Sequence, residues 1–144
     1  MFDAISRLFQ QAPELPDFRS DPKLAVAALL VHLAGVDGTV KEEERAAVRA
    51  VLTDHYGLEA DEVDRLFADA TRQANDAVDF YRFTSALTSL PEEERIEIIR
   101  MMWQVVFADK KNHELEDNMV WRVAELIGVS ARQRTILRNQ MAKA

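Results

Sequence analysis

The stretch from Asp21 to Glu44, DPKLAVAALLVHLAGVDGTVKEEE, joins a long apolar run to an acidic connection and decides the fold. Aspartate followed by proline is typical of a helix start, because the carboxylate caps free backbone N–H groups and proline has no N–H to leave unpaired. The run that follows has little polar surface, which predicts a central helix buried on most sides. We expect this helix to end at about Val36 and a second helix to begin among residues 41–44.

The same pattern returns 72 positions later, in residues 93–116, EERIEIIRMMWQVVFADKKNHELE. Apolar positions recur in register: Leu24, Val26, Leu29, Leu30, Val31 and Leu33 match Ile96, Ile98, Met101, Met102, Trp103 and Val105. Any two amphipathic helices share apolar periodicity, so matches in the polar connection are more informative. Those matches are Asp37/Asp109, Glu42/Glu114 and Glu44/Glu116. The sequence therefore predicts an internal duplication, with halves at about residues 21–75 and 93–144 related by a pseudo-twofold axis.

The rest of the chain predicts more helices and no convincing strand. The 144 residues include only four Gly and four Pro among many good helix formers, and 48% are hydrophobic and 30% charged, as in an ordinary single soluble domain. After the second helix, which Tyr56-Gly57 should stop, we expect further helices after Leu58, from about Val78 to Leu87, from Pro91-Glu92, and from Ser130 to Met141. The fold class is all-α: a compact domain of about seven to eight helices over residues 21–144.

Residues 1–20 form a separate N-terminal segment in this interpretation. A short amphipathic helix is expected first, followed by a linker that contains Pro13 and Pro16, and the residues on the apolar face of that helix are Phe2, Ile5, Leu8 and Phe9. The segment lacks the basic leader and the cleavage site of a secretory signal. We expect the helix to pack on the domain or to form a homodimer. The alternative is shallow docking on a membrane or on a partner protein.

The charge and composition exclude several classes of function. A net charge of -7 argues against nucleic-acid binding, because lysines and arginines must replace the counterions of a phosphate backbone. The absence of cysteine excludes thiolate metal sites and thiol catalysis, and it suits a reducing, cytoplasmic location. No apolar run approaches the ~20 residues of a membrane-spanning helix. The sequence predicts a cytoplasmic protein without a transmembrane segment.

The duplicated connections could bring four carboxylates together, from Asp37, Glu44, Asp109 and Glu116. Calcium takes six to eight oxygen ligands, so these groups with carbonyls and water would suit Ca²⁺, whereas Mg²⁺ would keep more of its waters. His113 would add a nitrogen and favour a transition metal. The alternative is that the aspartates close turns and the glutamates stabilise the positive ends of the following helices. Sequence chemistry leaves both interpretations open.

The first connection also matches the last eight positions of a calcium-binding EF-hand loop, from an acidic ligand at Asp37 to a closing Glu44. The two earlier liganding positions fall on Leu33 and Gly35, which have no side-chain oxygen. This connection therefore supplies at most half of a calcium cage.

Several stretches together resemble the TerB-like family of bacterial tellurite-resistance proteins. The likeness covers about residues 24–141, and the stretches that carry it are VDGTV (36–40), EEE (42–44), VDFYRF (78–83), PEEER (91–95), FAD (107–109), HELED (113–117) and RVAELIGVS (122–130). The resemblance implies a compact all-helical domain of two pseudo-symmetric halves. It also implies an association with tellurite resistance and chemical-stress responses, and no enzymatic activity.

The resemblance further implies a divalent metal site, with Asp37, Glu44, Asp109 and Glu116 as ligands by matching position. Lys110-Lys111-Asn112 departs from the acidic, glycine-containing turn expected in the second half, and two cations there oppose a bound metal.

Three functions remain from different classes. The first is a non-enzymatic, cation-binding domain of the TerB-like type. The second is a helical module that binds a protein partner or itself and holds no metal. The third and weakest is a carboxylate-based metallohydrolase. No Ser/His/Asp or Cys/His arrangement and no phosphate-binding glycine loop accompanies the carboxylates.

Overall fold

A computed structural model describes residues 21–36, 40–76, 80–109 and 114–143, with residues 75, 76, 80, 81 and 109 described by their backbone alone. These residues form seven α-helices and one short 3₁₀ helix, η1, and they contain no strand. The elements are α2 (Pro22–Ala34), α3 (Glu42–Tyr56), α4 (Ala60–Asp76), α5 (Phe80–Leu87), α6 (Glu92–Val106), η1 (Phe107–Asp109), α7 (Glu114–Ile127) and α8 (Ala131–Lys143). The predicted all-α class is confirmed.

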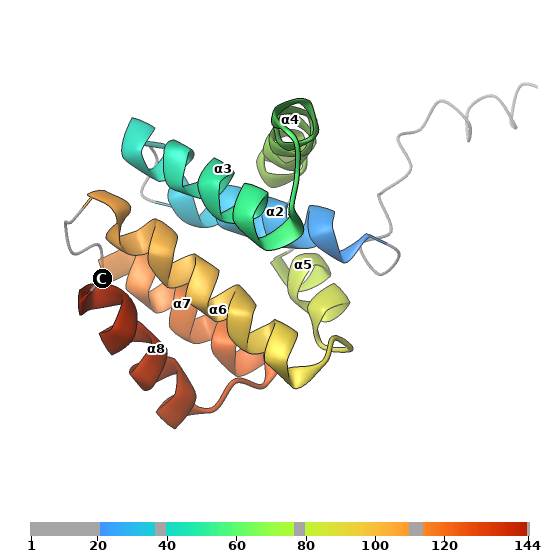
Figure 1. The fold of residues 1–144 in the computed structure, drawn as a ribbon. Helices are drawn as coiled ribbons and strands as arrows, with labels where there is room; N and C mark the ends of the chain where they lie inside the picture. Colours follow the sequence, from blue (N-terminus) through green and yellow to red (C-terminus); the bar gives the residue numbers. More distant parts are fainter. Residues whose placement is uncertain (1–20, 37–39, 77–79, 110–113, 144) are drawn as a thin grey trace, which may run out of the picture.

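Helix α2 starts where the sequence predicts. The Asp21 carboxylate accepts a hydrogen bond from the Leu24 backbone N–H at 3.2 Å, and Pro22 occupies the first helical position. Nine of its 13 residues are buried, and the helix contacts α3, α4, α5, α6 and α7. In Figure 1, α2 runs through the middle of the bundle. The long apolar run therefore forms the centre of the domain.

A single glycine ends the second helix of each predicted half. Gly57 follows α3 with φ +63°, and Gly128 follows α7 with φ +80°. The next residue closes each turn, because Leu58 N–H donates to the Thr53 carbonyl at 3.2 Å and Val129 N–H donates to the Ala124 carbonyl at 2.9 Å. This left-handed cap favours glycine, which has no Cβ to strain the backbone. The predicted stop at Tyr56-Gly57 is confirmed.

The helices form two groups of three. Helices α2, α3 and α4 contact one another, and so do α6, α7 and α8. The groups meet where α6 contacts α2 and α3 and where α7 contacts α2, and α5 contacts both α2 and α7. Figure 1 shows α3 above α6 on the near side, with α2 and α7 behind them. The predicted duplication requires two such groups, and the pseudo-twofold axis itself stays a prediction.

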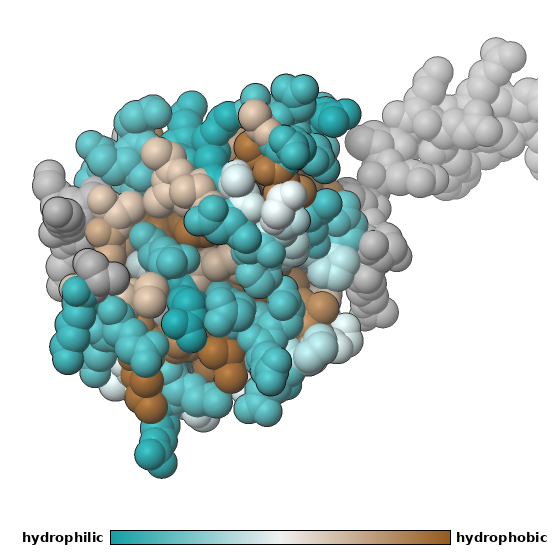
Figure 2. Space-filling model, in the orientation of Figure 1, coloured by the Kyte–Doolittle hydropathy of each residue, from teal (hydrophilic) through white to brown (hydrophobic). Residues whose placement is uncertain are grey.

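Helix α6 supplies the largest buried side chain of the core. Trp103 is fully buried, and its ring centroid lies 5.8 Å from that of Phe107 and 6.4 Å from that of Trp121. The aromatic contacts join α6 to η1 and α7. Hydrophilic residues cover most of the molecular face shown in Figure 2. The domain thus has an apolar interior built around α2 and α6 and a charged exterior.

Some sequence-based predictions fall outside the described residues. They concern the N-terminal helix and linker in residues 1–20, and the start of the fourth helix at Val78. Among the helices that are described, none is long and apolar enough to cross a membrane.

Candidate metal centre

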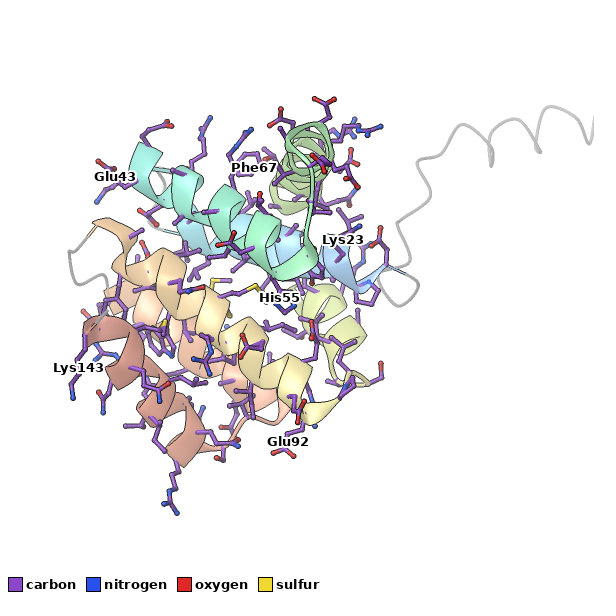
Figure 3. The ribbon with its side chains drawn as sticks, in the orientation of Figure 1. Lys23, Glu43, His55, Phe67, Glu92 and Lys143 are labelled. Atoms are coloured by element: carbon purple, nitrogen blue, oxygen red, sulfur yellow. The ribbon has the colours of Figure 1, made fainter. Side chains whose placement is uncertain are left out.

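Glu44 lies in the first turn of α3 and is fully buried. Its neighbours Glu42 and Glu43 are exposed, and Figure 3 shows Glu43 pointing outward from the start of α3. Three consecutive glutamates therefore have two different environments, because helix geometry turns only one of them toward the interior. The buried member is the one predicted as a ligand.

Glu116 repeats this arrangement in the first turn of α7. Its side chain is also fully buried, whereas Glu114 is exposed. The adjacent Leu115 is 55% exposed. Hydrophobicity alone would place the leucine inside and the glutamate outside. The structure has the opposite orientation, so the α7 start buries a carboxylate and exposes an apolar side chain.

The starts of α3 and α7 lie at the same end of the bundle, on the left in Figure 1. Helix α3 contacts η1, the short element that follows α6. The end of α2 meets the start of α7 in a similar way, because His32 and Val36 line a cavity of about 270 Å³ together with Leu115. Each acidic connection therefore begins beside the helix start of the other half.

The structure places two of the four predicted ligand side chains. Asp37 lies outside the described residues, and Asp109 is described as the last residue of η1 without its side chain. Among the described side chains, no three acidic or histidine residues gather as a metal cluster. The grouping of Asp37, Glu44, Asp109 and Glu116 around one ion therefore stays a prediction.

The burial of Glu44 and Glu116 requires electrostatic compensation. Moving an ionised carboxylate out of water costs several kcal/mol in proteins. The positive end of a helix returns only ~0.3–1 kcal/mol at the surface and up to ~2 kcal/mol in partly buried sites. Helix capping alone therefore offsets part of the desolvation, and the rest must come from the other interactions of each carboxylate. Buried oxygen donors of this kind fit a hard divalent cation.

The start of α7 is fixed by a residue that the sequence did not single out. Arg138 of α8 donates to an Asp117 carboxylate oxygen at 3.1 Å. Its guanidinium carbon also lies 5.5 Å from the ring centroids of Trp103 and Phe107. Arg138 thus connects α8, α7 and η1 beside Glu116. No local sequence signal identifies this contact, because 21 positions separate the arginine from the aspartate.

His32 occupies a half-buried position near the end of α2 and lines two cavities. Burial lowers the pKa of its imidazole from the ordinary value of 6.5, so the ring is neutral at pH 7. Arg45 lines one cavity and Arg122 lines the other. The ring therefore shares each of its two cavities with an arginine.

His55 lies outside the acidic connections and contacts a glutamate of α6. Its Nε2 atom lies 2.7 Å from an oxygen of Glu94, in the first turn of α6. Figure 3 labels His55 where the end of α3 faces α6. This contact holds the two groups of helices together at the end opposite the buried glutamates.

A family model described as tellurite resistance protein TerB matches residues 23–139. No curated protein and no solved structure matches the chain. The matched region overlaps every described helix and contains both acidic connections, and it covers most of the chain. The chain therefore belongs to the tellurite resistance protein TerB family.

Proposed function

We propose that this TerB domain is a non-enzymatic protein that binds one divalent cation between its two acidic connections. The observation that supports the proposal is the complete burial of Glu44 and Glu116 in the first turns of α3 and α7. Asp37 and Asp109 would complete the ligand set from the two connections. The domain would respond to the ion in a tellurite-resistance or chemical-stress setting.

Calcium or magnesium suits this set better than a softer metal. The four proposed ligands offer only oxygen, and the chain has no cysteine. Ca²⁺ tolerates irregular coordination and several carboxylates, whereas Mg²⁺ needs near-octahedral geometry and retains water. Lys110 and Lys111 make the second connection less acidic than the first. We therefore expect the first half, with Asp37 and Glu44, to contribute more of the affinity.

Thermal unfolding with added cations tests the proposal. An ion that binds only the native state raises the Tm, by roughly 5–10 °C when its concentration is a hundred times the Kd. The whole chain is first stripped with chelator and then melted with Ca²⁺, Mg²⁺, Mn²⁺ or Zn²⁺. We expect Ca²⁺ or Mg²⁺ to give the largest increase, and Glu44→Gln and Glu116→Gln to remove it.

The exposed neighbours provide matched controls. Glu43→Gln and Glu114→Gln change the net charge by the same amount, one or two positions away from the buried carboxylates. The cation-dependent increase should survive in both. Equal melting curves with and without every cation would contradict the proposal, as would an equal loss of the increase in the control variants.

A protein-interaction module is the second candidate function. Leu115 and Ile136 are large apolar side chains that are 55% and 46% exposed, on α7 and α8. Exposed apolar residues favour contact with another protein when they form part of one patch. In this case the acidic residues serve only as helix caps. Binding of a partner that survives amide replacement of all four carboxylates would support this function over cation binding.

A further inference from the structure

A second cavity, separate from the buried glutamates, lies between α2, α3 and α4. Its volume is about 390 Å³, and its walls are largely apolar, with Val31 from α2, Val48 from α3, and Phe67 and Ala74 from α4. Small-molecule sites in proteins are typically concave, mostly apolar and ~300–1,000 Å³ in volume. The size and the lining of this cavity therefore fit a small molecule with an apolar body.

The cavity lining carries one cationic side chain, that of Arg45. It also includes His32, and none of its described residues is acidic. The Arg45 side chain is exposed, and no carboxylate of the described part of the chain forms an ion pair with it. One helical turn later, Arg49 does form such a pair, with Asp64. An arginine that pairs with no described carboxylate is notable beside an apolar cavity in a chain with a net charge of -7.

The remaining polar group of the lining already has a partner. The Thr71 hydroxyl donates to the Phe67 carbonyl at 2.8 Å, so its hydrogen does not point into the cavity. The group available to donate to a ligand is the Arg45 guanidinium. It suits an acceptor with negative charge, because a planar guanidinium matches the two oxygens of a carboxylate.

The geometry points to a binding site for a small apolar carboxylate. The carboxylate lies at the mouth against Arg45, and the apolar chain extends between α2 and α4 toward Phe67 and Ala74. Arginine holds its charged end in water at such a position while its stem covers apolar surface. Arg45 is adjacent to Glu44 in sequence, yet one side chain is exposed beside the cavity and the other is buried. The described lining of the site therefore contains neither Glu44 nor Glu116.

The test uses decanoate as the probe, with decanol and decyltrimethylammonium for comparison. Binding to the full chain is measured by titration calorimetry below micelle-forming concentrations, in buffer that contains EDTA. The chelator removes divalent cations, so the result does not depend on whether the acidic connections bind a metal. We expect saturable 1:1 binding of decanoate, at least tenfold weaker binding of decanol, and no binding of the cation.

Two variants probe the two parts of the site. Arg45→Gln should weaken decanoate binding by about tenfold or more, because a charge-assisted contact is lost, and should leave decanol binding unchanged. Ala74→Trp should abolish binding of both compounds by filling the cavity. Arg65→Gln is the matched control, because it removes one positive charge from α4 at a residue that does not line this cavity. Circular dichroism verifies that each variant folds.

Several results would overturn the assignment. Equal affinities for decanoate and decanol would show that the arginine does not recognise the charged group. An equal loss in Arg45→Gln and Arg65→Gln would indicate general charge attraction instead of a site. Absence of saturable binding, or binding that survives in folded Ala74→Trp, would also reject it. If Ala74→Trp does not fold, Arg45→Gln still decides the matter, because its side chain is exposed.

Discussion

The third helices of the two groups, α4 and α8, are held in place by different chemistry. Helix α4 buries Val63, Leu66 and Ala70, and it packs along α2. Helix α8 packs on α6 and α7, and its only buried residue is Leu137. The third helix of the first group is thus attached by an apolar face, whereas the third helix of the second group buries little apolar surface.

Arginines provide much of the attachment of α8. Arg134 donates to the Trp121 carbonyl and to a Glu125 carboxylate oxygen, each at 3.0 Å, and its guanidinium carbon lies 4.7 Å from the centre of the Trp121 ring. Arg138 adds its contact with Asp117. Because Asp117 is next to Glu116, Arg138 also fixes the helix start that carries a buried carboxylate. In the second group, therefore, a contact that holds α8 in place lies directly beside a candidate metal ligand, Glu116.

The substitution with the largest expected effect on stability lies in the core of the second group. Trp103→Ala should destabilise the domain by about 3–5 kcal/mol, because Trp103 is fully buried and contacts both Phe107 and Trp121. Val31→Ala, at the matching position of the first half, removes far less volume and should have a smaller effect. Urea unfolding followed by circular dichroism measures both. A Trp103→Ala loss below about 1 kcal/mol would contradict this view of the core.

Arg138→Met distinguishes the attachments of α4 and α8. It should lower the free energy of unfolding by about 1–3 kcal/mol, because the mostly buried Asp117 carboxylate loses a charged donor. The matched change is Arg49→Met, which breaks the more exposed pair with Asp64 and should cost about 0–1 kcal/mol. The same urea experiment compares them. Equal losses would mean that the arginines of α8 have no special role.

The two glycines with a left-handed backbone conformation, Gly57 and Gly128, allow the two groups to be compared at their helix ends. Gly57→Ala should cost about 1 kcal/mol from backbone strain alone, since no atom lies within 4 Å of the added Cβ. Gly128→Ala should cost about 2 kcal/mol, because its Cβ would approach Arg95 Nη1 at 3.0 Å and disturb the 2.8 Å hydrogen bond from that nitrogen to the Ile127 carbonyl. Thermal melts should rank the variants in that order. The reverse ranking would show that Arg95 moves freely.

The smallest expected effect is the contribution of His32, in the first half, to the pH dependence of stability. The folded-state pKa of His32 is lowered by burial, so folding opposes its protonation. Its contribution to stability is complete above the unfolded pKa of about 6.5 and is lost as the pH falls through the folded-state value. His32→Gln introduces the residue found at the matching position 104. Between pH 7 and pH 5, the Tm of the variant should fall less than that of the parent. An equal fall would contradict a lowered pKa of His32.

Much of the fold could be predicted from sequence because its signals are local. Asp21-Pro22 marks a helix start and Gly57 marks a helix end, and both act through backbone atoms within a few residues. The apolar run of α2 also predicts its central place. The contacts of Arg134 and Arg138 could not be predicted, because they depend on how α8 lies across α7. The exposure of Ile136 likewise depends on how α8 packs on α6 and α7.

The candidate site was predictable only in part. A glutamate in the first turn of a helix ordinarily faces water, and nothing near Glu44 or Glu116 distinguishes these two from the exposed Glu43 and Glu114. The 72-residue repeat paired Glu44 with Glu116, but it also paired Glu42 with Glu114, which are both exposed. The burial of Glu44 and Glu116 depends on the orientation of α3 and α7 relative to the rest of the bundle, which local sequence does not encode.

Calorimetric titration of the chelator-stripped chain with Ca²⁺ tests the central claim most directly, since it counts the ions that bind. A site shared by the two halves predicts one ion per chain, at least tenfold weaker binding in both Glu44→Gln and Glu116→Gln, and unchanged binding in Glu43→Gln. Two ions per chain, each weakened by only one of the two buried variants, would contradict a shared site. Absence of binding with Ca²⁺ and with Mg²⁺ would contradict the cation function altogether.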